Sequence, residues 1–422
     1  MSKPVVVCFG PGPRFKGGIQ NYNTSLALAL DRRGDCEVHI VSWTQQYPAI
    51  IPREFVDKSS TADLLEGSQV KVHYVTNYNR PGTWRDTVRL ITSLGASKVI
   101  FQWSIALQGW PLSYIAKRLN KISGLEVIFD VHFVQQKEHS SIDRYFTKRA
   151  LQHAQTVIVH AKKTWEELQG IFPQKSFHYT ESGERGTNTV IKLYHPIYDL
   201  FKPDPNLDIA QLKAEWGLKQ HVFLFFGFIR RYKGLDRAIQ AFAKVRSKRD
   251  DVSLVIAGES FWNTLDQNKW STRWKQWIFG WAKKIVLNKK DDEREDQPLE
   301  WIAKLGIEED CYVVNRFIGN EEVHRYFQVS DAVVLFYRTA TPSGIESLSY
   351  NFSLPLLATK VGHFPETIQD GFNGYLANDE DIEDMARVIE KFLEQPIPRE
   401  NVKSSTQNMS WDRYAQAIMG SL

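Results

Sequence analysis

The sequence predicts two doubly wound α/β domains in tandem. Its 422 residues exceed one ordinary hydrophobic core, so two domains of roughly 200 residues each are expected. In both halves, short runs rich in Val, Ile and aromatic residues alternate with amphipathic stretches, a pattern typical of buried parallel strands covered by helices. Pro196, Pro203 and Pro205 interrupt the chain between the two series of runs. We therefore expect domains at 1–200 and 201–400, followed by a C-terminal segment at 401–422.

The predicted strands follow from these apolar runs. In the first half they are Val5–Phe9, Val38–Trp43, Val70–Val75, Val99–Trp103, Val127–Val131, Val157–His160 and Val190–Tyr194. In the second half they are Val222–Phe226, Leu254–Ala257, Tyr312–Val314, Ala332–Phe336 and Leu356–Ala358. The segment from Trp411 onward is expected to be a short amphipathic helix.

Composition excludes several classes of protein. Hydrophobic residues make up 42% and charged residues 24%, as in globular proteins, and a net charge of +4 is too small to indicate nucleic-acid binding. Cys8, Cys36 and Cys311 are expected to be reduced thiols of a cytoplasmic protein. No run approaches the ~20 apolar residues of a membrane span. The first apolar run is broken by Gly-Pro-Gly-Pro and predicts a strand, not a secretion signal. Any membrane contact is therefore expected to be peripheral.

Ligands of open α/β sheets bind beyond the carboxyl ends of the strands, so the loops that follow strands are the candidate sites. After the first strand, Gly17 and Gly18 open a helix. Backbone can approach a ligand closely there, and helix N–H groups attract an anion. A plain strand-to-helix turn is the alternative. The loop lacks the GxGxxG dinucleotide fingerprint, so we infer no nicotinamide cofactor.

The loop after the first strand of the second half is basic. It places Arg230, Arg231 and Lys233 between Gly227 and Gly234. A diphosphate requires compact positive charge beside an accessible backbone, with Arg as a forked donor and Lys as a point charge. A solvated basic turn is the alternative interpretation.

A third loop, Tyr337-Arg-Thr-Ala-Thr-Pro-Ser-Gly-Ile345, precedes a helical pattern. Small hydroxyl residues with Gly344 at a helix start suit a phosphate. Ser343 could equally be an ordinary N-cap.

His132 ends a strand of the first half within Asp130-Val-His132. It could be a base, a sugar contact or an inert polar residue, and nearby Glu138 could be a solvated loop residue. The 11 histidines are dispersed, and neither HxxxH nor CxxC spacing occurs. We therefore expect no metal site.

Taken in order, these loops resemble the GT-B family of retaining glycosyltransferases, the glycosyl transferases group 1, in particular its family 4-like members. The resemblance covers nearly the whole chain, although each motif alone is weak. The matching motifs are Gly17-Gly-Ile-Gln-Asn-Tyr22, Gly227 with Lys233-Gly234, Tyr337-Arg-Thr-Ala-Thr-Pro-Ser-Gly344, Pro355-Leu-Leu-Ala-Thr359 and Phe364-Pro-Glu366.

The resemblance implies two Rossmann-like domains that face each other across a cleft, with the C-terminal helix crossing back to the first domain. It implies that Lys233 and Arg230 hold the donor diphosphate and steady the leaving group. It places His132 near the transferred sugar and Glu138 at an acidic position that contacts sugar or acceptor. The implied donor-binding residues are Gly17, Gly18, Gly227, Arg338, Ser343, Gly344, Ile345 and Glu346.

The chain departs from the family pattern at several positions. Phe228 stands where most members have an arginine, so Arg230 must do that work. Leu348 occupies the position of the usual ribose-binding glutamate, and Glu346 is either its substitute or a helix N-terminal acid. His363 stands where a second glycine is common. These departures put the nucleotide contact in question.

An insertion at 260–300 is rich in tryptophan and lysine. Trp270, Trp274, Trp277 and Trp281 recur at steps of 4, 3 and 4, which places them in a helical stripe of about 80 degrees. Tryptophan with flanking basic residues suits a helix lying on anionic lipid. Packing onto the second domain or onto a partner are the alternatives.

The sequence thus predicts a retaining transferase that moves a sugar, expected to be a hexose, from a nucleotide-diphosphate sugar to an acceptor hydroxyl. The resemblance implies that no metal or further cofactor is required. The expected acceptor is a glycan or lipid-linked glycan of surface polysaccharide or glycolipid assembly, with the protein cytoplasmic or peripheral on the inner face of the membrane. The alternatives are a non-catalytic scaffold that binds a glycan or a partner, a nucleotide-sugar epimerase, and a phosphorolytic enzyme.

Overall fold

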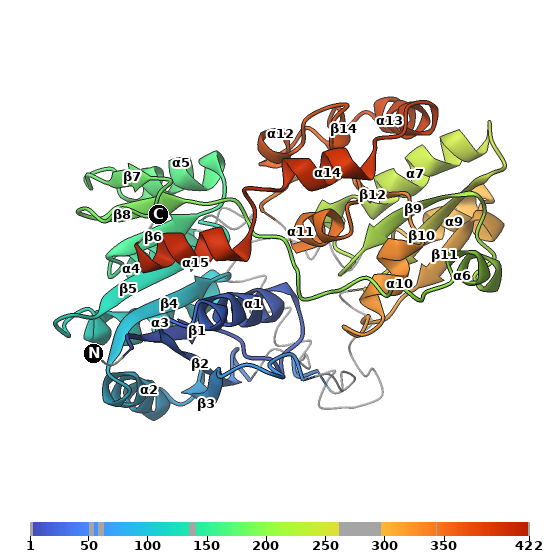
Figure 1. The fold of residues 1–422 in the computed structure, drawn as a ribbon. Helices are drawn as coiled ribbons and strands as arrows, with labels where there is room; N and C mark the ends of the chain where they lie inside the picture. The colour runs from blue at the N-terminus through green and yellow to red at the C-terminus, as the bar shows by residue number, and fades with distance from the viewer. Residues whose placement is uncertain are drawn as a thin grey trace. The chain divides into compact units, whose positions relative to one another are not determined.

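The chain forms two compact α/β units, each built on an open parallel sheet (Figure 1). The computed structural model describes residues 3–49, 55–57, 63–134, 141–260, 297–342 and 344–420, with only the backbone of Ser141 and Ile142. One unit is Met1–Leu200 with Asn408–Leu422, and the other is Phe201–Gln407. The predicted fold class, two Rossmann-like doubly wound domains, is confirmed. Within the described residues, no helix combines the length and the apolar character needed to cross a bilayer.

The sheet of the first unit has the order β3-β2-β1-β4-β5-β6-β8-β7, and all of its neighbouring strands are parallel. Its interior strands are buried on both faces, which explains their continuous apolar runs. The strands are β1 Val5–Phe9, β2 Glu37–Gln45, β3 Lys71–Asn77, β4 Ala96–Trp103, β5 Glu126–Val131, β6 Thr156–Val159, β7 His178–Thr180 and β8 Thr189–Lys192.

Helices cover this first sheet and bury their apolar stripes against it. They are α1 Gly18–Arg32, α2 Pro81–Ser93, the short 3₁₀ helix η1 Ala106–Gln108, α3 Gly109–Leu119, α4 Ser141–Leu151, α5 Lys162–Ile171 and the C-terminal α15 Trp411–Met419. The predicted C-terminal helix is therefore present as α15, and it packs against α1. Arg185 holds its end by donating to the carbonyls of Ala417, at 3.0 Å, and Ile418, at 2.5 Å.

The sheet of the second unit has the order β11-β10-β9-β12-β13-β14. Its strands, all parallel, are β9 His221–Phe226, β10 Val252–Ala257, β11 Cys311–Val314, β12 Ala332–Leu335, β13 Leu356–Thr359 and β14 Gly374–Ala377. The strand order reverses between β9 and β12. In open α/β sheets the ligand crevice lies outside the carboxyl ends of the strands at such a reversal.

The helices of the second unit connect these strands. They are α6 Ile209–Glu215, η2 Arg231–Lys233, α7 Leu235–Arg246, α9 Glu300–Leu305, η3 Glu308–Asp310, α10 Val323–Gln328, α11 Gly344–Asn351, α12 Phe364–Thr367, α13 Ile382–Glu394 and α14 Arg399–Ser405. α13 packs on α7, and its N-cap Asp381 accepts a hydrogen bond from the backbone N–H of Asp384 at 3.0 Å. α14 lies in the second unit, and α15 lies in the first.

Two strands have no counterpart among the predicted runs. β7 is three residues long and partly exposed, and β14 begins at a glycine. A Cβ at Gly374 would lie 2.4 Å from the carbonyl oxygen of Leu356, so close approach of the neighbouring strand β13 requires glycine there. Short edge strands of this kind lack the apolar run on which the prediction depends.

Candidate active site

Gly227 directly follows β9. Because it has no side chain, a small space remains beside it, between the amine of Lys233 and the apolar side chain of Ile345. Its φ is +92°, a conformation that residues with a side chain rarely adopt. A Cβ at this position would lie 3.0 Å from the Lys233 amine (Nζ) and 3.0 Å from Cδ1 of Ile345. The structure thus brings three predicted donor-site residues together at the reversal of strand order. We refer to the space among Gly227, Lys233 and Ile345 as the Gly227 cradle.

Lys233 supplies a buried amine to the cradle. Its side chain lies at the end of η2 and is only 6% exposed. Burial, together with the nearby charge of Arg230, lowers the pKa of Lys233 to about 7. Both effects favour the neutral amine, and a bound anion would stabilise the charged ammonium form.

The backbone around Lys233 is held in place by a close approach of two loops. Gly234 adopts φ +61° at the N-cap of α7. A Cβ there would lie 2.1 Å from the carbonyl oxygen of Phe336, at the end of β12. The loop after β9 can therefore lie directly against the loop after β12 only because residue 234 is glycine.

Arg338, predicted to bind the donor, makes contacts within the protein. Its guanidinium donates to the Asp236 carboxylate at 2.5 Å and to the carbonyl of Arg231 at 3.3 Å. Its backbone N–H donates to the carbonyl of Tyr232 at 2.8 Å. In this structure Arg338 ties the loop after β12 to the first turn of α7. A donor contact of Arg338 stays a prediction.

The first turn of α11 contributes Gly344, Ile345 and Glu346. The Glu346 side chain is buried and both of its carboxylate oxygens are engaged. One accepts a hydrogen bond from Nε2 of His363, and the other accepts from the Thr367 hydroxyl at 2.5 Å. Glu346, the possible substitute for the usual ribose-binding glutamate, is thus in direct contact with His363, a departure from the family pattern. Leu348, which occupies the position of that glutamate, is 4% exposed and packs in the core.

In the first unit, Gly17 and Gly18 border an open space at the start of α1. Nothing lies within 4 Å of a Cβ built at Gly17. At Gly18 the nearest atom would be the Tyr198 hydroxyl at 3.7 Å, and this hydroxyl donates to the Gly18 carbonyl at 2.9 Å. The backbone at this helix start is accessible to a ligand, as the sequence predicts.

His132 follows β5 and is 5% exposed. Its Nε2 lies 2.8 Å from the amide oxygen (Oε1) of Gln102 at the end of β4. Burial lowers the pKa of His132 to about 4, against the opposing effect of the Asp130 charge. Asp130 itself lies 2.9 Å from Nε2 of His160. Sequence reasoning did not single out Gln102 or His160. The available signal was a polar residue at or just after the end of an apolar strand.

The chain matches known proteins over both units. Residues 208–409 match the family model described as Glycosyl transferases group 1. The second unit of this chain is a glycosyl transferases group 1 domain. Spore coat protein SA of Bacillus subtilis (strain 168) is 22% identical over 238 residues, which are 54% of this chain and 55% of that protein. The chain therefore spans about half the length of this curated relative.

Solved structures extend the likeness beyond the group 1 domain. A structure of Anabaena HepE in complex with UDP is 16% identical, with a TM-score of 0.64 over 99% of this chain and 98% of that one. A structure of WaaG, a glycosyltransferase involved in lipopolysaccharide biosynthesis, is 16% identical, with a TM-score of 0.59 over 99% of this chain and 100% of that one. At these identities the likeness shows the fold, which is GT-B.

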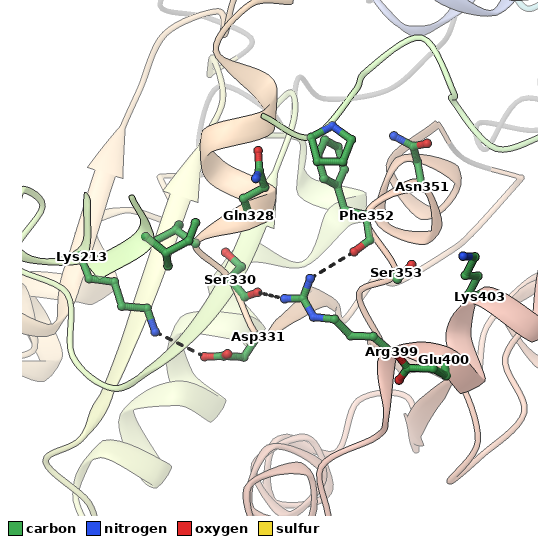
Figure 2. A pocket seen from close by; sticks show the side chains of 13 residues that line it. Lys213, Gln328, Ser330, Asp331, Asn351, Phe352, Ser353, Arg399, Glu400 and Lys403 are labelled. Atoms are coloured by element: carbon green, nitrogen blue, oxygen red, sulfur yellow. Dashed lines mark hydrogen bonds and ion pairs between the residues drawn. The ribbon is translucent and has the colours of Figure 1, made fainter. Parts of the chain in front are cut away.

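The group 1 domain also contains a cavity of about 640 Å³, and Figure 2 shows the side chains that line it. It lies at the amino ends of β12 and β13, the end of the sheet opposite the Gly227 cradle. Three of its charged side chains make contacts within the protein. Arg399 donates to the carbonyls of Ser330, at 3.2 Å, and Phe352, at 3.4 Å, and Lys213 lies 4.0 Å from Asp331. These carbonyls follow α10 and α11, so Arg399 stabilises two helix ends. We assign this cavity no part in the site.

Some predicted site residues lie outside the described part of the chain. They are Ser343 of the group 1 domain, Glu138 in the first unit, and the insertion residues Trp270, Trp274, Trp277 and Trp281. Within the described residues, no cluster of three or more His, Cys, Asp or Glu side chains could hold a metal ion.

Proposed function

We propose that this protein is a retaining glycosyltransferase of the family 4-like type, which moves a sugar from a nucleoside-diphosphate sugar to an acceptor hydroxyl. The observation that carries the proposal is the Gly227 cradle, in which an accessible backbone adjoins the buried amine of Lys233. The cradle itself is too narrow even for a methyl group, so a diphosphate would bind against its outer side and there supply the negative charge that the amine needs. A protein that only binds glycan has no need of such a group.

In the proposed reaction, the bond between the sugar and the diphosphate breaks, and the diphosphate leaves with the bonding electrons. Lys233 and Arg230 stabilise the negative charge that develops on it, because a fixed cation in a water-poor site acts most strongly where charge appears. The backbone N–H groups at the start of α11 and the open backbone at Gly17 and Gly18 add hydrogen-bond donors. The acceptor hydroxyl attacks from the face that the leaving group vacates, and its proton passes to an oxygen of the departing diphosphate. We propose that this chemistry requires neither a metal nor a further cofactor.

Neighbours of this fold support a proposal for the donor base and the acceptor. HepE is described in complex with UDP and with UDP-glucose, so we propose a uridine nucleotide and a hexose as the donor to test first. WaaG is described as involved in lipopolysaccharide biosynthesis, which favours a glycan or lipid-linked acceptor of surface polysaccharide assembly. With such an acceptor, the tryptophan stripe of the insertion would contact anionic lipid at the inner face of the membrane.

Thermal unfolding with UDP, GDP, ADP, TDP and CMP, first without metal and then with magnesium, tests the donor class. A ligand at ~100 times its dissociation constant adds about 2.7 kcal/mol to the free energy of unfolding, which gives a measurable rise in the midpoint. We expect one nucleoside diphosphate, UDP, to stabilise the protein without metal. Stabilisation by none of them would favour the scaffold interpretation. Analysis of the sugar product separates transfer from epimerisation or phosphorolysis.

Nucleotide binding is expected to draw a proton onto Lys233. At pH 8 an amine with a pKa of about 7 is mostly neutral, whereas an amine beside a diphosphate is charged, so up to about one proton is taken up per nucleotide. In the free protein, the lowered pKa of Lys233 makes this residue's contribution to stability rise with pH between about 7 and 10.5. Calorimetric titration with UDP at pH 8, in two buffers of different ionisation enthalpy, measures the uptake. The same uptake in Lys233→Met would contradict the assignment.

A further inference from the structure

Three polar side chains at the ends of neighbouring strands form a buried chain that leads to His132. Gln102 is the second-to-last residue of β4, Asp130 is the second-to-last residue of β5, and His160 follows β6. The β4–β5 register pairs Gln102 with Asp130 directly. The amide nitrogen (Nε2) of Gln102 lies 3.5 Å from Oδ2 of Asp130, and its oxygen lies 2.8 Å from Nε2 of His132. The proposed reaction has so far assigned no role to Gln102, Asp130 or His160.

The carboxylate of Asp130 sets the direction of the hydrogen bonds in this series of side chains. Burial alone would raise the pKa of Asp130, but the charge and the hydrogen bond of His160 lower it, so the carboxylate is ionised and can only accept. His160 lies with its other ring nitrogen, Nδ1, 3.3 Å from the Leu193 carbonyl, which is also only an acceptor. Both ring nitrogens of His160 therefore face oxygen acceptors.

The same logic orients the Gln102 amide. Because Asp130 only accepts, the NH₂ group of Gln102 must face it, and the carbonyl oxygen must then face His132. An amide oxygen can only accept, so Nε2 of His132 must carry the hydrogen. The remaining ring nitrogen, Nδ1, keeps its lone pair, since the neutral imidazole has one donor and one acceptor.

We propose that Gln102, oriented by Asp130, is a positioning residue that holds His132 as the Nε2–H tautomer, so that Nδ1 accepts a hydrogen bond from a sugar hydroxyl. This inference rests on the proposed function, in which His132 lies near the transferred sugar. It adds that His132 orients a sugar hydroxyl by accepting a hydrogen bond from it, and that His132 is not the proton donor of the reaction.

The groups packed around His132 agree with a ring that stays neutral. Tyr22 from α1 meets it edge-on at 4.6 Å between ring centroids, and His195, after β8, lies 6.3 Å away. Burial raises the pKa of Tyr22 well above its ordinary value and lowers the pKa of His195 well below its own, and the nearby histidines lower it further. Tyr414 from α15 stacks on His160 at 6.0 Å, and burial also raises its pKa. Among the described residues, the carboxylate that faces this cluster is Asp130, and it lies 2.9 Å from Nε2 of His160.

Nuclear magnetic resonance of the full-length protein labelled with ¹⁵N-histidine tests the tautomer. Long-range proton–nitrogen correlations distinguish the Nε2–H from the Nδ1–H form, and the signal absent from His132→Gln identifies His132. We expect the Nε2–H pattern without change from pH 5.5 to pH 8.5. A wild-type spectrum with the Nδ1–H form, or titration of His132 in this range, would overturn the proposal.

Gln102→Met tests the cause, with Gln152→Met as the matched control because Gln152 lies on the surface near α4. Methionine keeps the length of the buried side chain but cannot direct a hydrogen bond. We expect His132 to become a mixture of tautomers in Gln102→Met, and kcat to fall about tenfold with the KM for the donor changed less than twofold. An unchanged tautomer or an unchanged kcat would overturn the positioning role. If the wild-type protein transferred no sugar, the proposed function would fail, and the tautomer measurement would still decide the orientation by Gln102.

Discussion

Lys233→Ala is expected to lower the turnover number at least ~100-fold, a rise in the activation free energy of about 2.7 kcal/mol. The physical reason is the position of the amine. It is buried, it lies where a Cβ of Gly227 would contact it, and burial lowers its pKa to about 7, so the charged amine needs a compensating negative charge. The departing diphosphate would provide that charge, so removing the cation affects the transition state more than the folded protein. Steady-state kinetics with the donor found by thermal unfolding measures the change.

The matched control is Lys244→Ala. Lys244 lies in the last turn of α7, where it pairs with Glu383 at 2.6 Å on the surface. An exposed pair contributes little to stability, so this variant should keep the turnover of the wild type. The unfolding midpoint of Lys233→Ala without ligand should not fall, because removing a buried cation without a bound anion does not destabilise the fold. Turnover of Lys233→Ala within a few fold of the wild type would remove this residue from the mechanism.

Gly227→Ala is expected to weaken nucleoside diphosphate binding by ~10–100-fold, or about 1.4–2.7 kcal/mol. The new Cβ would lie 3.0 Å from both Lys233 Nζ and Ile345 Cδ1, closer than ordinary van der Waals contact. Either the amine or α11 must move, and both border the space that we assign to the diphosphate. Calorimetric titration at fixed pH measures the dissociation constant, and the activity of the variant should fall with it.

Backbone strain by itself must be separated from the loss of space. Gly217→Ala is the control, because Gly217 also has a positive φ, of +64°, in the same unit, while nothing lies within 4 Å of a Cβ built there. Both variants carry the cost of placing a side chain at positive φ, of about 1 kcal/mol or more. The control should bind the nucleotide as the wild type does. Equal losses in the two variants, or unchanged binding in Gly227→Ala, would show that the cradle is not the diphosphate site.

The sequence was informative about the loops because the residues of each loop lie close together in the chain. Gly227, Lys233 and Gly234 lie within eight positions of one another, so their spacing alone suggested a basic loop with accessible backbone. Arg338 shows where this reasoning ended. Its donor contact stays a prediction, but its pairing with Asp236, which lies 102 positions away in the chain, could not be foreseen from local spacing.

The Glu346–His363 contact is a similar case. Glu346 and His363 each stood out in the comparison with the family pattern, but their separation of 17 positions gave no sign that they are in contact. The packing of α12 against α11 brings them together, so the two substitutions form one feature. Each carboxylate oxygen of Glu346 can accept one more hydrogen bond. A contact between Glu346 and a ribose therefore stays a prediction.

From the sequence alone came the fold class, the strands with apolar runs, the C-terminal helix and the loops that carry glycine and basic residues. These depend on patterns repeated over a few positions, which local backbone geometry and burial dictate. The tertiary structure alone decided the strand order, and with it that the ends of β4, β5 and β6 stand side by side. Gln102, Asp130 and His160 are about 30 positions apart in sequence, and only the parallel pairing of their strands makes them one hydrogen-bonded chain that orients His132.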